Sequence, residues 1–374
     1  MKKSIKLFFI LFISIFIPIT QSNGQSVTDN KVNDTIKPLM KKYHINGIAV
    51  AVIDHSKKSI YVFGKTNRGD EITVNTLFQL GSITKVMTTL LLSEDILTRQ
   101  IKITDPMTNY LTQFSKNAFL KKITLEQLAT FSSGLPFNQP DEIATKSQLQ
   151  QYLLYWEPKS TTENQWRYSN ISIGILGDIL SKEKHQNINK LFENNIFSPL
   201  NMRSSNLKAR PETQPWSEIF FPSTWALQSN IIDMSHFLAA AIGLKNTQKN
   251  ILLAMHFSQT PHIQVGNMGQ ALAWQIFSLN NRKNLLDSNQ YMNLLKSFPI
   301  KKLPLDKQRY SSNALIDKTG MTHRFESYIA VIPNQESGIV ILVNNTHVSL
   351  NSVVKAGRKI LLCCEKNKMH TYEQ

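Results

Sequence analysis

The stretch FQLGSITK, residues 78–85, decides how the rest of the chain is interpreted. Ser82 stands three residues before Lys85, at the start of an apolar run whose spacing near 3.6 residues predicts a helix. Residues three apart on a helix have Cβ atoms about 5–6 Å apart, so a hydroxyl and an amine would share one helix face. The free N–H groups of a first helical turn would favour an anion developing at Ser82. Ser-x-x-Lys is common by chance, however, and a capping serine beside a solvated lysine is its more frequent explanation.

Composition and charge describe a basic globular protein. The 374 residues, of which 41% are hydrophobic and 18% charged, suffice for one large domain or two ordinary ones. The formal net charge of +16 comes from scattered residues, without the clustered basic run and interleaved aromatic residues of a nucleic-acid-binding protein. The nine histidines are scattered too, so we expect no metal site and no cofactor. Cys363 and Cys364 are adjacent, which is poor geometry for a structural disulfide; helix packing, intermolecular pairing and free thiols stay open.

Residues 1–24 have the pattern of a cleavable signal peptide. Three lysines precede an apolar stretch at residues 7–20, and Ser22 and Gly24 suit a cleavage site before Gln25. The apolar stretch is short for a membrane span, although an uncleaved anchor is the alternative. We therefore expect an exported, periplasmic protein without stable membrane insertion after cleavage.

The order of strand and helix patterns predicts an α+β fold. A helix is expected at residues 27–43 and strands at 48–53, 60–63, 314–316, 327–332 and 338–343, with a closing helix at 351–362. Patterns between residues 81 and about 300 are mostly helical. The simplest architecture is one antiparallel sheet built from both chain ends and flanked by helices. In this division, residues 25–80 and 303–374 form a sheet domain, residues 81–302 form a helical domain, and the active site lies at their junction.

Two further motifs give Ser82 a chemical context. Tyr168-Ser169-Asn170 lies in the helical region, and Lys318-Thr319-Gly320 lies on a predicted strand just before the last hairpin. Either motif alone is weak, because a buried tyrosine is usually part of the core. Their order, however, with Ser-x-x-Lys first, is typical of penicillin-recognising serine enzymes.

On these residues the chain resembles the class C β-lactamases, over nearly the whole mature protein. The matching stretches are residues 78–85, 123–130, 134–136, 168–170, 172–174, 318–320 and 327–333. No Gly-x-Ser-x-Gly elbow surrounds Ser82, which argues against an ordinary α/β-hydrolase. The same motifs also serve D-Ala-D-Ala peptidases and esterases, so they specify the fold better than the substrate.

The resemblance implies a catalytic group. Ser82 Oγ would attack the lactam carbonyl and form an acyl-enzyme. Either Lys85 or Tyr168 would be the first base, and the sequence leaves the choice open. Lys318 would lower the pKa of Lys85, and Tyr168 would protonate the leaving nitrogen and later activate the deacylating water.

The resemblance also implies substrate-binding residues. Lys318 and Thr319 would hold the substrate carboxylate, with Gly320 completing that motif. Asn170 would hold the substrate amide carbonyl and Lys85, and Asn138 stands where the family usually has a glutamine that contacts the substrate side chain. The N–H groups of Ser82 and Met321 would form the oxyanion hole.

Several stretches depart from the family. Residues 321–326, MTHRFE, replace a small residue and a glycine-rich turn with bulk and charge beside the site. The loop at residues 208–225 looks shorter than the family's, with Trp225 near the usual tyrosine wall. Ser349 and Ser352 do not clearly match the family's carboxylate-binding residues. We therefore expect the substrate-binding surface to differ from that of the family.

The leading hypothesis is a monomeric periplasmic serine β-lactamase whose partner is a small β-lactam substrate. A D-Ala-D-Ala carboxypeptidase or esterase of the same fold is the enzyme alternative. A β-lactam-binding protein that acylates without turnover is the alternative from another class.

Overall fold

The computed structural model describes residues 27–158, 164–208, 220–281, 285–286, 296–344 and 348–362. The predicted signal peptide, Cys363 and Cys364, and residues 209–219 of the loop expected to be short lie outside this description.

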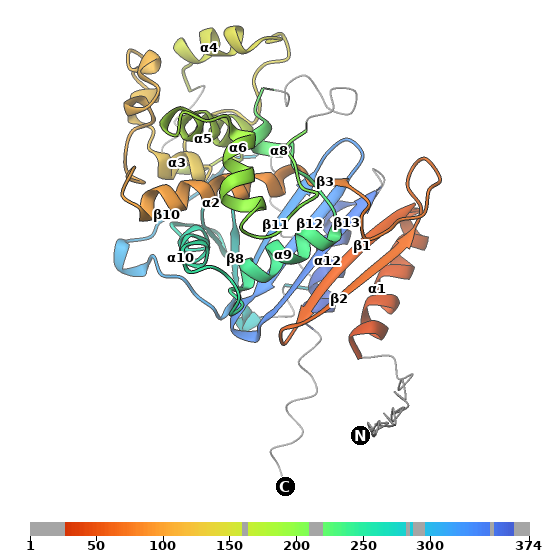
Figure 1. The fold of residues 1–374 in the computed structure, drawn as a ribbon. Helices are drawn as coiled ribbons and strands as arrows, with labels where there is room; N and C mark the ends of the chain where they lie inside the picture. Colours follow the sequence, from red (N-terminus) through yellow and green to blue (C-terminus); the bar gives the residue numbers. More distant parts are fainter. Residues whose placement is uncertain are drawn as a thin grey trace, which may run out of the picture.

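One large antiparallel sheet organises the molecule (Figure 1). Its nine strands run in the order β10-β6-β7-β8-β11-β12-β13-β1-β2. Their bounds are β1 Gly47–Asp54, β2 Lys57–Gly64, β6 Ile263–Val265, β7 Met268–Gln270, β8 Gln275–Ser278, β10 Lys301–Lys302, β11 Ala314–Met321, β12 Glu326–Ile332 and β13 Ser337–Asn344. Two small sheets join β3 (Phe78–Gln79) to β5 (Gln228–Ser229) and β4 (Gln165–Trp166) to β9 (Phe298–Pro299).

The two ends of the chain meet in this sheet, as the sequence predicts. β1 pairs with β2 on one side and with β13 on the other, with Ile48 opposite Val343. Seven of the eight β1 residues are buried, which explains its almost continuous apolar run. The α+β fold with an antiparallel sheet from both ends is confirmed.

The sheet takes more of the chain than the sequence analysis expected. Strands β6, β7, β8 and β10 come from residues 263–302, in the stretch whose patterns indicated mainly helix. They have two to four residues each, too short for a two-residue alternation to emerge from the sequence. The proposed division into a sheet domain and a helical domain stays a prediction.

Helices cover both faces of the sheet and form a lobe beside it (Figure 1). Their bounds are α1 Val27–Tyr43, α2 Thr84–Leu97, α3 Leu125–Ala129, α4 Lys146–Leu154, α5 Asn170–Glu183, α6 Ile188–Phe192, α8 Pro222–Trp225, α9 Ile231–Ile242, α10 Lys249–Ser258 and α12 Leu350–Leu362. α9 packs on β1, β12 and β13 from one face, and α12 packs on β11, β12 and β13 from the other. Helices α2, α3, α4, α5, α6 and α8 form the lobe.

Helix α2 lies at the centre of the lobe. It contacts α5, α8 and α10, and ten consecutive residues from Thr84 to Ser93 are buried. Five of these ten residues are polar, and the hydroxyls of Thr88 and Thr89 donate hydrogen bonds to the carbonyls of Ser223 and Leu272. A 3-10 turn, η1 (Gly81–Ile83), precedes it, so Ser82 lies just before the α-helix and not in its first turn.

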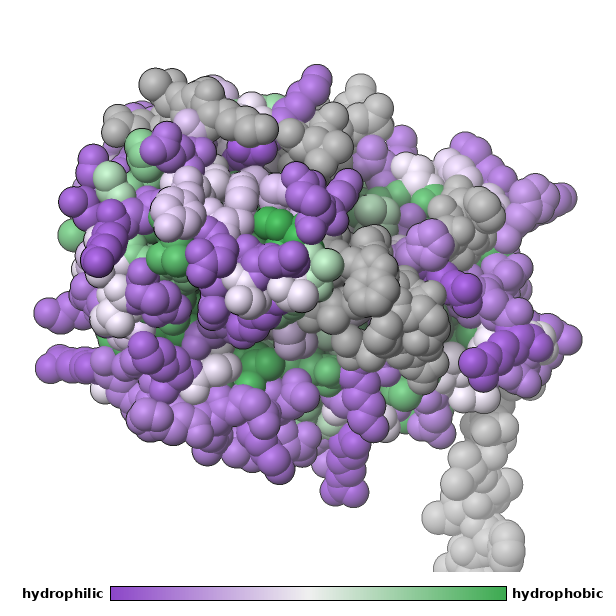
Figure 2. Space-filling model, turned by 90° about the horizontal axis from the view of Figure 1, so that it is seen from above, coloured by the Kyte–Doolittle hydropathy of each residue, from purple (hydrophilic) through white to green (hydrophobic). Residues whose placement is uncertain are grey.

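The described surface is mostly polar. Figure 2 shows hydrophilic side chains over most of the face seen from above, with hydrophobic residues in small patches. The large exposed hydrophobic residues come from separate elements: Val62, Leu77, Leu97, Phe119, Tyr155, Leu253, Leu305 and Met321. Among the described residues, no helix combines the length and apolar character needed to cross a membrane.

Candidate active site

Ser82 and Lys85 are in direct contact at the start of α2. The Lys85 Nζ donates hydrogen bonds to Ser82 Oγ at 2.9 Å and to the carbonyl oxygen of Thr224 at 2.8 Å. The Lys85 side chain is fully buried, whereas Ser82 is partly exposed. A buried amine held against a reachable hydroxyl is the arrangement of an activated nucleophile and its base.

Backbone contacts hold the turn that presents Ser82. The Leu80 N–H donates to the carbonyl of Leu227, where β3 meets β5, and the Leu80 carbonyl accepts from Ser327 Oγ at 2.8 Å. Thr84 Oγ1 donates to the Gly81 carbonyl and accepts from the Leu227 N–H. Ser327 of the large sheet and Leu227, next to the β3–β5 sheet, therefore hold the turn in place before the helix begins.

Gly81 is required for this turn. Its φ of +51° lies in the left-handed region, which residues with a side chain rarely adopt. A Cβ there would lie 2.7 Å from the Met321 nitrogen and 2.4 Å from the Met321 carbonyl oxygen. The missing side chain thus lets the end of β11 approach the Ser82 turn closely. Gly320 has the same function, since a Cβ there would lie 1.9 Å from the Leu80 oxygen.

This approach brings Met321 to the edge of the site. β8 pairs with β11 only as far as Asp317, opposite Gln275, so the later residues of β11 have no β8 partner on that edge. The Met321 backbone therefore lies beside the turn that carries Ser82, in reach of a group bound there.

Tyr168 stands between two lysines. The ammonium nitrogens of Lys85 and Lys318 lie 5.2 and 5.3 Å from its ring centroid, and Lys318 Nζ is 3.5 Å from its hydroxyl oxygen. The ring stacks on Phe131 at 4.5 Å between centroids, which fixes its plane. Lys85, Lys318 and the Tyr168 hydroxyl therefore form one polar cluster beside Ser82.

Lys318 is buried and its pKa is displaced. Desolvation lowers the pKa of Lys318 to about 7, and the neighbouring Asp317 carboxylate opposes this by favouring the charged form. The Lys318 Nζ also donates to the carbonyl oxygen of Thr319 at 2.9 Å. Near neutral pH this amine exists in both protonation states, so it can serve as an anion-binding cation and as a proton-transfer group.

Asn170, two residues after Tyr168, pairs with Asn138. The Asn170 Nδ2 donates to Asn138 Oδ1 at 2.6 Å, and the Asn170 N–H donates to the Phe137 carbonyl at 2.8 Å. Ser169 caps α5 through the Ser172 N–H, which places Asn170 at the first turn. The loop residue Asn138 and the helix residue Asn170, 32 positions apart, thus form one amide pair.

A family model described as Beta-lactamase matches residues 32–360. The chain belongs to the beta-lactamase family. It is 28% identical to a beta-lactamase of Escherichia coli K12, over 88% of this chain and 93% of that protein. It is 27% identical to one from Pseudomonas fluorescens, over 88% of this chain and 97% of that protein.

Solved class C beta-lactamases share the fold. One in complex with cefoxitin has a TM-score of 0.81 at 25% identity, covering 89% of this chain and 98% of that chain. A beta-lactamase/D-alanine carboxypeptidase from Pseudomonas syringae has a TM-score of 0.82 at 24% identity, covering 91% of this chain and all of that one. The class C resemblance expected from the sequence is confirmed.

Several contacts in this beta-lactamase family site could not be predicted from the sequence. The Thr224 carbonyl that holds Lys85 is a backbone group. Behind Lys318, the Asp317 carboxylate accepts from the Tyr328 hydroxyl at 2.7 Å and from Arg358 Nη2 at 2.8 Å. These partners come from β11, β12 and α12, so only the folded chain brings them together.

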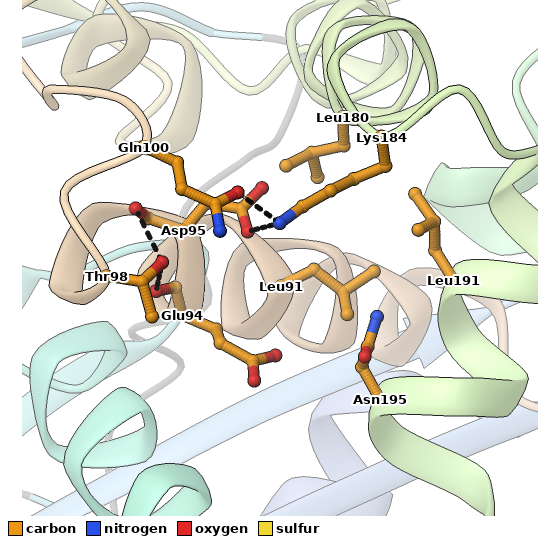
Figure 3. Close-up of a pocket in the computed structure, with 9 residues that line it drawn as sticks. All are labelled: Leu91, Glu94, Asp95, Thr98, Gln100, Leu180, Lys184, Leu191 and Asn195. Atoms are coloured by element: carbon orange, nitrogen blue, oxygen red, sulfur yellow. Dashed lines mark hydrogen bonds and ion pairs between the residues drawn. The ribbon is translucent and has the colours of Figure 1, made fainter.

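A pocket in the beta-lactamase family fold lies away from this chemistry (Figure 3). Lys184 contacts Asp95 at 2.6 Å across it, near the end of α2 farthest from Ser82. A helix of 14 residues is about 20 Å long, so the pocket is not part of the active site. Within the described ranges, no three histidine, cysteine or acidic residues cluster as metal ligands.

Proposed function

We propose that this protein is an exported serine hydrolase that opens the β-lactam ring through an acyl-Ser82 intermediate. The observation that carries the proposal is the 2.9 Å contact between Lys85 Nζ and Ser82 Oγ, next to a tyrosine flanked by two lysines. Membership of the beta-lactamase family and a similar fold that binds cefoxitin support it.

Acylation would begin with proton transfer from Ser82 Oγ. Lys85 is within hydrogen-bonding distance of that oxygen and would accept the proton directly or pass it toward Tyr168. The oxygen would attack the lactam carbonyl, whose developing negative charge would be held by the N–H groups of Ser82 and Met321. Each such donor is worth about 10²- to 10³-fold in rate.

Tyr168 would then donate a proton to the leaving ring nitrogen. Its hydroxyl lies 3.5 Å from Lys318 Nζ and its ring lies beside both amines, so it is placed to exchange a proton with them. In deacylation the same hydroxyl would activate the water that attacks the ester. Lys318 and Thr319 would bind the substrate carboxylate, and the Asn170–Asn138 pair would face the acyl side chain amide.

The setting of this reaction is proposed from the sequence. Residues 1–24 would direct the chain to the periplasm and be removed there. The mature protein would act as a monomer, because the exposed hydrophobic residues are scattered over separate elements.

The test uses mature protein, a Ser82→Ala variant and a Ser56→Ala control, in which an exposed serine at the β1–β2 turn is changed. Each is mixed with a chromogenic cephalosporin while intact mass follows the acyl adduct. The proposal predicts hydrolysis and a transient adduct in wild type and control, and neither in Ser82→Ala. Hydrolysis that survives in Ser82→Ala would rule the proposal out.

Two other outcomes identify the alternatives. A stable adduct without turnover would indicate a β-lactam-binding protein. D-alanine release from a pentapeptide, with slow β-lactam hydrolysis, would indicate a carboxypeptidase.

A further inference from the structure

The hairpin that carries Met321 contains two buried acids, and Glu326 is the one that lies directly opposite Met321. It begins β12, is only 5% exposed, and pairs with Met321 on β11 and with Val343 on β13. Directly opposite residues in antiparallel strands point to the same face, with Cβ atoms about 4.5–5.5 Å apart. The Glu326 side chain therefore lies beside that of Met321, whose backbone borders Ser82.

The neighbours of Glu326 across the sheet are apolar. The cross-strand row runs Met321, Glu326, Val343, Ile48 and Phe63, in which Glu326 is the single ionisable residue. Its Oε2 is buried without a hydrogen-bond partner among the described residues. Loss of hydration raises the pKa of Glu326 to about 8. The carboxyl is therefore mostly protonated at neutral pH.

Other charged groups nearby are already engaged or point elsewhere. On the same face, Asp317 binds Arg358 and the hydroxyl of Tyr328. Lys318 faces the opposite side of β11, toward Tyr168, because side chains alternate along a strand. At the turn between β11 and β12, His323 and Arg324 are exposed.

We propose that Glu326 is a proton-controlled positioning group for the reaction at Ser82, which permits full acylation only while its carboxyl is uncharged. Ionised Glu326 would place a negative charge behind the Met321 N–H, where the oxyanion develops and where an anionic substrate must bind. Both effects oppose the reaction. This inference rests on the proposed function, because it takes the Met321 N–H as an oxyanion donor.

The effect should be measurable. Two like charges about 10 Å apart in a partly hydrated interior repel enough to slow a reaction about tenfold. The rate should fall as pH rises through the pKa of Glu326, because the charged form accumulates above it. Lys318 titrates nearby as well, but its contribution is common to wild type and Glu326 variants and cancels in their ratio.

The experiment compares kcat/KM for one cephalosporin between pH 5.5 and 10 in wild type, Glu326→Gln and Glu326→Met. Glutamine keeps the shape, and methionine suits the apolar row if glutamine impairs folding. Glu336→Gln is the control, because this exposed acid lies at the far end of the β12–β13 hairpin. The ratio of wild type to each Glu326 variant should be constant below pH 7 and fall about tenfold above pH 8. The ratio to Glu336→Gln should stay flat.

A flat ratio for both Glu326 variants would overturn the inference. In that case a Ser82-dependent reaction would still stand, so the proposed function would survive. Loss of the proposed function would instead be seen as activity that persists in Ser82→Ala.

Discussion

Gly81→Ala tests how closely β11 must approach the nucleophile. Alanine in the left-handed region costs about 1–2 kcal/mol. Its Cβ would also lie 2.4–2.7 Å from Met321 backbone atoms, which cannot rotate away as a side chain would. Relieving that overlap requires a shift of about 1 Å between the Ser82 turn and β11, and displacement of that size near reacting groups costs about 10²-fold in rate.

Gly266→Ala is the matched control. Its φ of +56° is close to the +51° of Gly81, but a Cβ there would meet nothing within 4 Å. In the control, alanine therefore has the same unfavourable backbone conformation as in Gly81→Ala, but its Cβ overlaps with no neighbouring atom. We expect urea unfolding to show a loss of about 1–2 kcal/mol for Gly266→Ala and a greater loss for Gly81→Ala. The value of kcat/KM on a chromogenic cephalosporin should fall only in Gly81→Ala. Equal kcat/KM in the two variants would show that the reaction does not require the close approach of Met321 to the Ser82 turn.

Two further predictions concern the buried charges behind the site. Burial lowers the pKa of Lys318 from 10.5 to about 7, so the unfolded chain binds more protons between these values and the free energy of unfolding rises with pH. Between pH 7 and 9, the free energy of unfolding measured in urea should rise by about 2 kcal/mol more in wild type than in Lys318→Met. The same pH dependence in both proteins would contradict the lowered pKa of Lys318. Asp317→Asn leaves Arg358 buried without its carboxylate and should cost about 3–5 kcal/mol by thermal unfolding. Glu71→Gln is the control, because it breaks an exposed ion pair with Lys65 and should lower stability by less than about 1 kcal/mol. A similar loss of stability in Asp317→Asn and Glu71→Gln would contradict a stabilising role for the buried Asp317–Arg358 pair.

The sequence predicts those parts of the fold that have a repeating local pattern. The β1–β2 hairpin and helices α1 and α12 lie close to their expected positions, because long strands and amphipathic helices have a recognisable pattern of hydrophobic residues in the sequence. Strands β6 to β8 are too short to have such a pattern. They join the sheet through β8, which pairs with β11, a strand distant in sequence.

For the active site, the sequence motifs predict which side chains take part, but they do not predict the contacts that hold those side chains in place. Ser82, Lys85, Tyr168 and Lys318 are brought together as the ordered motifs suggest, while their catalytic roles stay predictions. The Thr224 carbonyl that holds Lys85 has no side-chain signature. A glutamate is usually solvated, so burial of Glu326 cannot be inferred without the cross-strand register.

The most direct test of the central claim locates the acyl group. Wild-type protein is acid-quenched within its first turnovers of a cephalosporin, digested with trypsin and sequenced by mass spectrometry. Cleavage after Arg68 and Lys85 yields the peptide of residues 69–85, which contains Ser82. We predict the acyl mass on this peptide, with fragments that assign it to Ser82. An acyl group on any other residue, or turnover in which rapid quenching traps none, would contradict nucleophilic catalysis by Ser82.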